Sequence, residues 1–317
     1  GKPPFFATLK WKLILTSVLC TAAVSLFGNL FLYYSMNAML TQKAESINAL
    51  HLATLSNQIN DALEDLSDLG NLCASDLQVV AALEWRGSSA TAMKQALEAQ
   101  NRLNAYLATS PVGEEIYQIT AFNTDGRFIS GSGLTYGMVQ DYALIAAQPV
   151  FQQMLTQSAP GGVVMYTTRS IHKYGGKCPY VVALLCPVRG LGSTVGHSFI
   201  YMELGLELFN AVLTPYDSWS SLYLADEGNL LLTPAGLDTD HTPDVAALAA
   251  AAQNERELKL AGREYRVTAV PLNAAGLSLY SCAELNVLDD DGAQTRMVVL
   301  TVLLSSLVLT VVLAFLL

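Results

Sequence analysis

Residues 119–130 read Ile-Thr-Ala-Phe-Asn-Thr-Asp-Gly-Arg-Phe-Ile-Ser, and residues 222–233 read Leu-Tyr-Leu-Ala-Asp-Glu-Gly-Asn-Leu-Leu-Leu-Thr. In each stretch an apolar run meets an acidic residue and a glycine, and a second apolar run follows. Glycine adopts the positive φ that a tight turn needs, so Asp125-Gly126 and Glu227-Gly228 both predict hairpins. The two turns are 102 residues apart. This spacing predicts two lobes built on one plan.

Each predicted hairpin is followed by a helical or loop segment and then by two longer strands. In the first copy these strands are Tyr180 to Val188 and Ser198 to Leu204. In the second copy they are Tyr265 to Leu272 and Leu277 to Glu284, joined through residues 273–276. The order of elements therefore predicts an α+β fold with two lobes.

The chain before the first hairpin has helical periodicity. One set of positions recurs at steps of three and four residues, which is one stripe of a long helix: Leu40, Ala44, Ile47, His51, Leu55, Ile59, Leu63, Leu66, Leu69 and Cys73. Ser75 and Gln78 have the spacing of a capping box and predict the start of a second helix. A third helix is expected from Ser88 and Ser89 to about Ala108, because Ser110, Pro111 and Gly113 follow.

Two apolar runs flank this region in a chain that is 52% hydrophobic, with a mean hydropathy of +0.35. Leu13 to Tyr34 has no charged residue and would span roughly 33 Å as a helix, enough to cross a bilayer. Met297 to Leu317 is a second run of sufficient length. A deep-core helix is the alternative for either run, and a cleaved signal peptide is the alternative for the first.

Lysines precede the first run at positions 2, 10 and 12, so the positive-inside rule places the N-terminus in the cytoplasm. We therefore expect a multi-pass protein of the cell membrane with residues 36–296 outside. The predicted organisation is a cytoplasmic N-terminus (1–12), a first transmembrane helix (13–35), the long helix with a membrane-distal lobe (36–218), a membrane-proximal lobe (219–288), a linker (289–296) and a second transmembrane helix (297–317). The apolar end also suggests that the chain is cut from a longer protein.

The charges exclude some classes of partner and activity. All 27 acidic residues lie between Glu45 and Asp291, with 12 basic residues, which gives this region a net charge of −15. No basic surface for nucleic acid is expected. The four histidines show no metal-ligand spacing, and no set of nucleophile, base and metal is present. We expect no cofactor, no metal site and no enzymatic activity in this chain, only binding of a small molecule.

The order of elements resembles the double Cache (dCache) family of extracytoplasmic sensor domains. The resemblance covers residues 36–296 and depends on the helix from Met36, the hairpin at Phe122 to Phe128, its echo at Leu224 to Leu230 and the closing strand at Tyr265 to Leu272. It implies two PAS-like lobes on a long N-terminal helix. Residues 55–83 look most like the YesM-like sensor histidine kinases. The Arg-x-Trp-Tyr element of amino-acid-binding members is absent between Tyr136 and Tyr180, so the resemblance implies no particular ligand.

The resemblance places the ligand between the distal sheet and the segments after the first hairpin. The aromatic and charged residues there can stack on and hydrogen-bond a small organic solute. The predicted ligand-binding residues are Tyr136, Asp141, Tyr142, Tyr166, Arg169 and Tyr180. A solvated loop that happens to be rich in tyrosine is the alternative.

The predicted function is the ligand-sensing part of a bacterial transmembrane receptor, most readily a two-component histidine kinase with its kinase after Leu317. Chemotaxis receptors, diguanylate cyclases and membrane-bound transcription regulators carry the same kind of ectodomain, and a non-signalling adhesion module is a further alternative. The apolar stripe of the long helix also predicts a homodimer formed along that helix. His51 on this stripe is either a packed residue or a pH sensor at the dimer seam.

Overall fold

The computed structural model describes residues 9–84, 90–124, 128–131, 142–156, 162–171, 180–188, 198–213, 220–233, 242–254, 257–260 and 262–284, and eleven positions between 297 and 312. These residues fall into two compact units. The terminal unit comprises Gly1–Leu50, Gly262–Tyr265 and Glu284–Leu317, and the lobe unit comprises His51–Ala261 and Arg266–Ala283.

A single helix, α1 (Leu9–Ser75), begins in the terminal unit and continues into the lobe unit. Its segment Trp11–Met36 has a mean hydropathy of 1.9 and is the one helix among the described residues that is long and apolar enough to cross a membrane. The predicted continuity between the first apolar run and the long helix is confirmed. The described residues between 297 and 312 are also helical.

Two shorter helices follow, α2 (Leu77–Glu84) and α3 (Ala90–Thr109). Both helices were predicted, but the predicted cap of α2 was wrong. Oδ1 of Asp76, not the Ser75 hydroxyl, accepts the N–H groups of Gln78 and Val79 at 2.7 and 3.2 Å. Ser75 instead belongs to the last turn of α1, where its hydroxyl bonds to the carbonyl of Leu72. Asp and Ser are equally common N-caps, so the capping-box spacing alone chose the wrong residue.

The distal sheet has five antiparallel strands in the order β2-β1-β5-β4-β3. The strands are β1 (Ile116–Asn123), β2 (Phe128–Gly131), β3 (Val164–Arg169), β4 (Tyr180–Pro187) and β5 (Ser198–Gly205). The first predicted hairpin is confirmed by the pairing of Phe122 with Phe128. The two longer strands are also confirmed. Strand β3 was not predicted, because residues 164–169 were assigned to a loop.

The proximal sheet repeats this plan in the order β7-β6-β10-β9-β8. Its strands are β6 (Ser220–Ala225), β7 (Leu230–Leu232), β8 (Glu257–Leu260), β9 (Arg263–Pro271) and β10 (Ser278–Glu284). Between its strands, Asp226 N–H donates to the carbonyl of Asn229 at 3.0 Å, which closes the second predicted hairpin. The sheets therefore confirm two lobes of one plan, while the exact domain boundaries stay a prediction.

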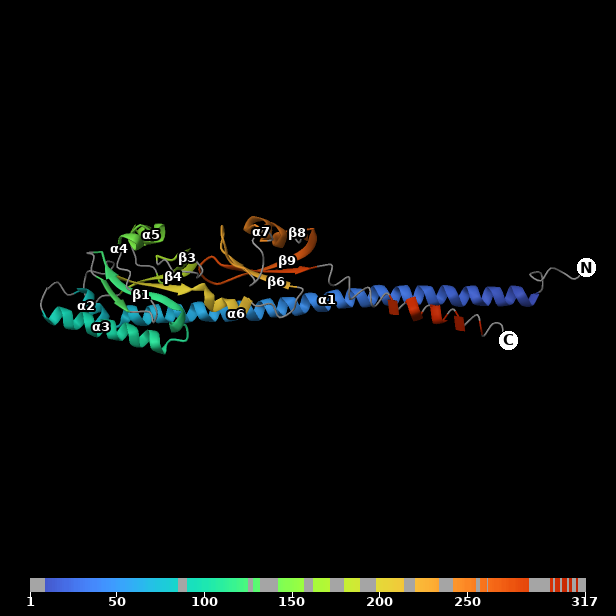
Figure 1. Ribbon diagram of the computed structural model, residues 1–317, viewed down its shortest axis with the longest axis horizontal. Coiled ribbons are helices and arrows are strands. Elements are labelled where there is room, and N and C mark those ends of the chain that lie inside the picture. The colour runs from blue at the N-terminus through green and yellow to red at the C-terminus, as the bar shows by residue number, and fades with distance from the viewer. Residues whose placement is uncertain are drawn as a thin grey trace, which may run out of the picture. The chain divides into compact units, whose positions relative to one another are not determined.

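Short helices connect the longer elements of both lobes. They are η2 (Gly113–Glu115), α4 (Tyr142–Ala146), α5 (Pro149–Thr156), η3 (Leu206–Phe209), α6 (Asn210–Leu213) and α7 (Val245–Gln253). Figure 1 shows α4 and α5 on one side of the distal sheet, with α2, α3 and the end of α1 on the other side. We call the side under α4 and α5 the outer face and the side against α1 the inner face.

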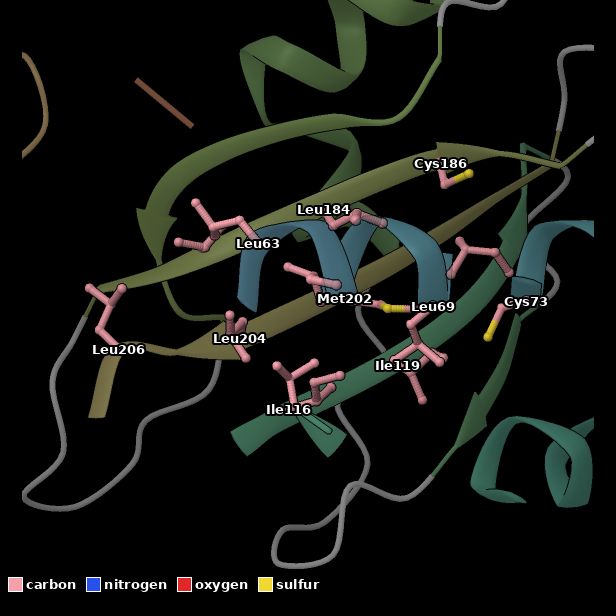
Figure 2. Close-up of a cluster of buried hydrophobic side chains, with 14 of the residues drawn as sticks. Leu63, Leu69, Cys73, Ile116, Ile119, Leu184, Cys186, Met202, Leu204 and Leu206 are labelled. Carbon is pink, nitrogen blue, oxygen red and sulfur yellow. The ribbon is translucent and has the colours of Figure 1, made fainter. Parts of the chain in front are cut away.

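The main core lies between the inner faces and α1. Figure 2 shows Leu63 and Leu69 of α1 among Ile119, Leu184 and Met202 of the distal sheet, and all five side chains are at most 4% exposed. The helix comes close to β4 at Gly70, where a Cβ atom would lie 2.8 Å from Cδ2 of Leu184. Burial of these apolar side chains away from water is the main source of stability for this layer.

This packing corrects one inference from the sequence. The apolar stripe of α1 faces the sheets of its own chain, so from Leu52 to Cys73 it is not available as a dimer seam. The exposed side of the same segment carries the acidic residues Asp61, Glu64 and Asp68. Periodicity identifies an apolar face but does not say what covers it.

Candidate ligand-binding face of the distal lobe

Side chains on a strand alternate between the two faces of a sheet, so the strand register defines rows on the outer face. Tyr166 on β3 pairs with Ala183 on β4, Ala183 pairs with Glu203 on β5, and Glu203 pairs with Gln118 on β1. These residues form one row across the sheet. The next row runs through Val164, Leu185, Tyr201, Thr120 and Ser130. Polar groups are therefore concentrated on the middle of this face.

Glu203 is the most unusual residue of the outer face, since its side chain is fully buried. Its carboxylate accepts hydrogen bonds from the Ser170 hydroxyl at 2.7 Å, the Ile171 backbone N–H at 3.0 Å and the Tyr201 hydroxyl at 2.8 Å. Burial raises the pKa of Glu203 because it disfavours the charged form, although these three donors oppose the shift. The carboxylate thus ties the residues just after β3 to the centre of the sheet.

Two tyrosines accompany Glu203. Tyr166 donates its hydroxyl to Oε1 of Gln148, which lies between α4 and α5, and Tyr201 donates to Glu203. Burial, together with the nearby Glu203 charge, raises the pKa of both phenols well above the usual value near 10. Both phenols are therefore neutral hydrogen-bonding groups at any physiological pH.

A second polar cluster continues the rows toward the edge strand β2. The Gln118 side-chain amide donates to the Thr120 hydroxyl at 2.8 Å, and Thr120 and Ser130 share a hydrogen bond of 3.1 Å. All three side chains are buried. Buried polar groups that are mutually bonded specify one arrangement of a core, so this edge of the face is preorganised.

The far end of the outer face is aromatic. Phe122, Phe151 and Phe199 pack with ring centroids 5.1 to 5.8 Å apart, and Ile145 and Met154 from α4 and α5 cover them. The face thus offers an apolar end and a polar centre with one buried carboxylate. This combination suits a small organic solute that has both a polar and an apolar part.

The structure separates the residues that the sequence grouped into one site. Tyr136 and Asp141 lie outside the described residues, and Tyr142 is described only as the first residue of α4. Tyr166 lies on the outer face, packed against the aromatic cluster. Arg169 is three residues further along β3 and projects to the opposite face, as does its partner Tyr180.

Arg169 and Tyr180 contact each other, and Tyr180 also contacts the proximal lobe. The Arg169 guanidinium carbon lies 5.5 Å from the centre of the Tyr180 ring, a cation–π distance. The Tyr180 hydroxyl donates to Oδ1 of Asn229 at 3.3 Å. Neither residue therefore shares the outer face with Tyr166.

Sequence reasoning missed Glu203, Tyr201 and Gln118. The available signal was an acidic residue inside an apolar strand, Ser-Phe-Ile-Tyr-Met-Glu-Leu, at the same parity as Phe199 and Tyr201. Charged residues are rarely buried in a sheet unless they are paired or functional, so this position was informative. In the described part of the chain, no group of three His, Cys, Asp or Glu side chains could hold a metal ion.

Comparisons with known proteins give structural matches only. No family model matches the chain, and no curated protein matches it by sequence. Among solved structures, the isoleucine-bound sensory domain of the Campylobacter jejuni chemoreceptor Tlp3 matches with a TM-score of 0.57 and 10% identity, covering 80% of this chain and 97% of that one. The match covers both lobes. The fold is therefore of the double Cache type.

Extracellular and sensor domains of histidine kinases also match. The extracellular domain of the putative histidine kinase vpHK1S-Z8 has a TM-score of 0.54 at 13% identity, over 79% of this chain and 98% of that one. The sensor domain of the Vibrio cholerae histidine kinase DctB has a TM-score of 0.51 at 15% identity, over 78% and 97%. The double Cache fold is thus shared by neighbours from both receptor classes.

Proposed function

We propose that this chain is the extracytoplasmic ligand-sensing region of a bacterial transmembrane receptor. The observation that carries the proposal is the outer face of the distal lobe, where Tyr166, Glu203 and Gln118 form a polar row beneath α4 and α5. Neighbours with the same fold include the ligand-binding domain of a chemoreceptor and the sensor domain of a histidine kinase. The chain itself binds its solute and catalyses no reaction.

The membrane arrangement is part of the proposal. The segment Trp11–Met36 and the run from Met297 both cross the bilayer, and residues 36–296 are extracytoplasmic. In the terminal unit the hydroxyl oxygens of Ser25 and Ser306 lie 2.8 Å apart, so the two helical runs pack side by side. A hydrogen bond between hydroxyl groups is a common means of pairing helices in lipid.

The output is proposed to be a histidine kinase of the YesM-like type, encoded after Leu317. A chemoreceptor output is the second candidate, because the first two neighbours are structures of a chemoreceptor. A homodimer is proposed to form through α1 on the membrane side of the buried stripe, where Ile47 and Leu50 are 48% and 70% exposed.

Calorimetric titration of the purified chain tests the sensor function. The probes are isoleucine, valine, glutamine, serine and GABA, which are the solutes named for neighbouring structures. We expect at least one probe to bind, and Tyr166→Ala to weaken that binding about tenfold through loss of a hydrogen bond and a packing surface.

Arg169→Ala is the matched control, since Arg169 lies on the same strand but on the opposite face. It should leave the affinity within about twofold. Loss of binding in Arg169→Ala together with unchanged binding in Tyr166→Ala would place the ligand on the inner side of β3 and refute the assignment of the outer face.

A further inference from the structure

Strand β3 is an edge strand of the distal sheet, and residues of the proximal lobe contact it. Two turns of the proximal lobe contact it. The β6–β7 turn reaches Thr167, and the β9–β10 turn reaches the backbone of Tyr166 through a bridge to Ala275. The edge strand of a sheet has unpaired backbone N–H and C=O groups, which proteins usually cover or protect. The two turns therefore also cover the edge of β3.

The β6–β7 contact depends on one carboxylate, that of Asp226. Oδ1 accepts the N–H groups of Gly228 and Asn229 at 2.8 and 2.6 Å, which fixes the turn. Oδ2 accepts the Thr167 hydroxyl at 2.7 Å. Both oxygens are therefore held, and the side chain forms a rigid link from the proximal turn to the distal strand.

The β9–β10 contact adds a second link. Ala275 has a φ of +61°, a conformation that is uncommon for a residue with a Cβ atom and persists only where the surroundings impose it. Two residues earlier, the N–H of Asn273 donates to Oδ1 of Asn60 on α1 at 2.9 Å. This turn therefore joins β3 to the helix that leads toward the terminal unit.

Thr167 and Tyr166 are adjacent, so their side chains point to opposite faces of β3. Thr167 is held by Asp226, whereas Tyr166 contributes to the outer face. We infer that Asp226, a residue of the proximal lobe, is a positioning residue for the ligand-binding face of the distal lobe. It acts through Thr167, because the hydrogen bond to Thr167 fixes the position and twist of the β3 backbone. The β3 backbone in turn fixes the position of the Tyr166 ring.

This inference rests on the proposed function, because it assigns a regulatory role to the proposed ligand-binding face. A ligand that moves Tyr166 must change the strength of the Asp226 link, and a weaker link must in turn change the affinity for the ligand, since coupling between two sites is reciprocal. The coupled elements are packed and hydrogen-bonded, so the link gives the ligand a path to the proximal lobe.

The test uses the purified full chain in detergent and needs no ligand. Hydrogen–deuterium exchange is measured at residues 165–168, and ¹⁹F NMR of 3-fluorotyrosine-labelled protein reports on the Tyr166 ring, with its signal assigned by its loss in Tyr166→Phe. In Thr167→Val we expect exchange in β3 to rise about tenfold, as for loss of one charge-assisted hydrogen bond. We also expect the Tyr166 signal to shift or broaden, although the substituted side chain lies on the other face.

Thr167→Ser keeps the hydroxyl and should restore both readouts. Thr109→Val is the matched control, because the Thr109 hydroxyl bonds only to carbonyls of its own helix among the hydrogen bonds described. Reciprocity predicts that Tyr166→Phe accelerates exchange at Gly228 and Asn229. Should Thr167→Val not fold, Thr167→Ala makes the same deletion without placing an extra methyl group beside Asp226.

An unchanged Tyr166 signal and unchanged β3 exchange in a folded Thr167→Val or Thr167→Ala variant would overturn the inference. Equal effects in Thr167→Ser would also overturn it, because the hydroxyl would then be irrelevant. Neither result would bear on whether the chain binds a solute, which is measured separately by calorimetry. Conversely, a failure of solute binding would remove the proposed function without changing these exchange rates.

Discussion

The Tyr106 hydroxyl on α3 donates a 2.5 Å hydrogen bond to Oδ2 of Asp76, while Oδ1 of the same carboxylate caps α2. Burial works against ionisation, but the Tyr106 hydroxyl and the N–H groups of Val79 and Gln78 outweigh it and lower the pKa of Asp76. One side chain thereby joins three helices: it follows α1, starts α2 and holds α3.

We expect Asp76→Ala to lower the free energy of unfolding by about 1 kcal/mol, the usual cost of a lost N-cap. Because the pKa is lowered in the folded state, the Asp76 contribution is complete above pH 3.8 and is lost as the pH falls through the folded-state pKa. Chemical denaturation at pH 7 and at pH 3 measures both effects. Asp68→Ala on the exposed side of α1 is the control, and a loss as large in this variant would argue against a specific cap.

A steric prediction concerns Gly113, at the start of η2. A Cβ atom there would lie 1.8 Å from the backbone oxygen of Leu107, which cannot move without unwinding the end of α3. Gly113→Ala should therefore destabilise the lobe unit by at least about 2 kcal/mol, as overpacking against backbone does. Gly228→Ala is the control, because a Cβ atom there meets nothing within 4 Å. Thermal unfolding of both variants would disprove the steric account if their midpoints fell equally.

The pH dependence of stability should also reveal Glu203, with the opposite sign to Asp76. Burial raises the pKa of Glu203 in the folded state, so its contribution is full below about pH 4.5 and is lost as the pH rises through the raised value. Glu203→Gln keeps one acceptor oxygen, which can still receive the Ile171 N–H and the Tyr201 hydroxyl on the Oε1 side, and it does not ionise. We expect the variant to lose this fall in stability above pH 4.5, as measured by denaturant titration at a series of pH values.

The control for Glu203 is Glu64→Gln, on the exposed side of α1. This variant should follow the wild-type pH profile. A Glu203→Gln profile that also follows the wild type would mean that Glu203 ionises as freely in the folded chain as in the unfolded one.

The elements that the sequence predicted are those with a local signal. The α1 stripe and the two Gly-containing hairpins each follow from a pattern within one short stretch. Strand β3 has no such pattern, because Val-Met-Tyr-Thr-Thr-Arg does not alternate between apolar and polar residues. Its inner positions contact the other lobe instead of water, and this context exists only in the folded chain.

The residues of the candidate site were harder to predict than the secondary structure, because strand pairing brings them together from distant parts of the chain. Grouping Tyr166, Arg169 and Tyr180 by proximity in the chain ignored the alternation of strand faces, which could be applied only once β3 and β4 were known as strands. Glu203 comes from a strand more than thirty residues further on, and strand pairing alone brings it to Tyr166. Long-range pairing of this kind is not encoded in the local pattern.

The topology is tested by cysteine-accessibility labelling at Ser88 and Asp240, two positions of the predicted exterior that lie outside the described residues. Single cysteines are introduced there in a variant in which the native cysteines are replaced by serine or alanine. Both should react with a membrane-impermeant maleimide in intact cells. Lys2→Cys, which lies before the candidate span, should react only after the membrane is opened, since the N-terminus is placed in the cytoplasm. Labelling of Ser88→Cys or Asp240→Cys only after opening would reverse the proposed orientation.

The last prediction concerns how α1 carries a signal, and the buried stripe determines where it can be tested. An insertion after Ser56 would break the helical register between Leu52 and Ile59, which are both fully buried in the core. Lys43 is exposed and lies between the candidate membrane span and the buried stripe, so an insertion after it spares both. Two residues there would turn the membrane segment by about 200° relative to the lobe unit, at roughly 100° per residue.

In the full-length receptor we expect this two-residue insertion to leave solute binding unchanged and to abolish the change in output on binding, because a rotated helix presents a different face to its partner. A seven-residue insertion at the same point is the matched control. It adds more length but turns the helix by about 700°, close to two full rotations, so it should restore much of the response. Two outcomes would show that the rotational orientation of α1 does not carry the signal. One is a normal output response with two inserted residues, and the other is an equal loss of response with two and with seven inserted residues.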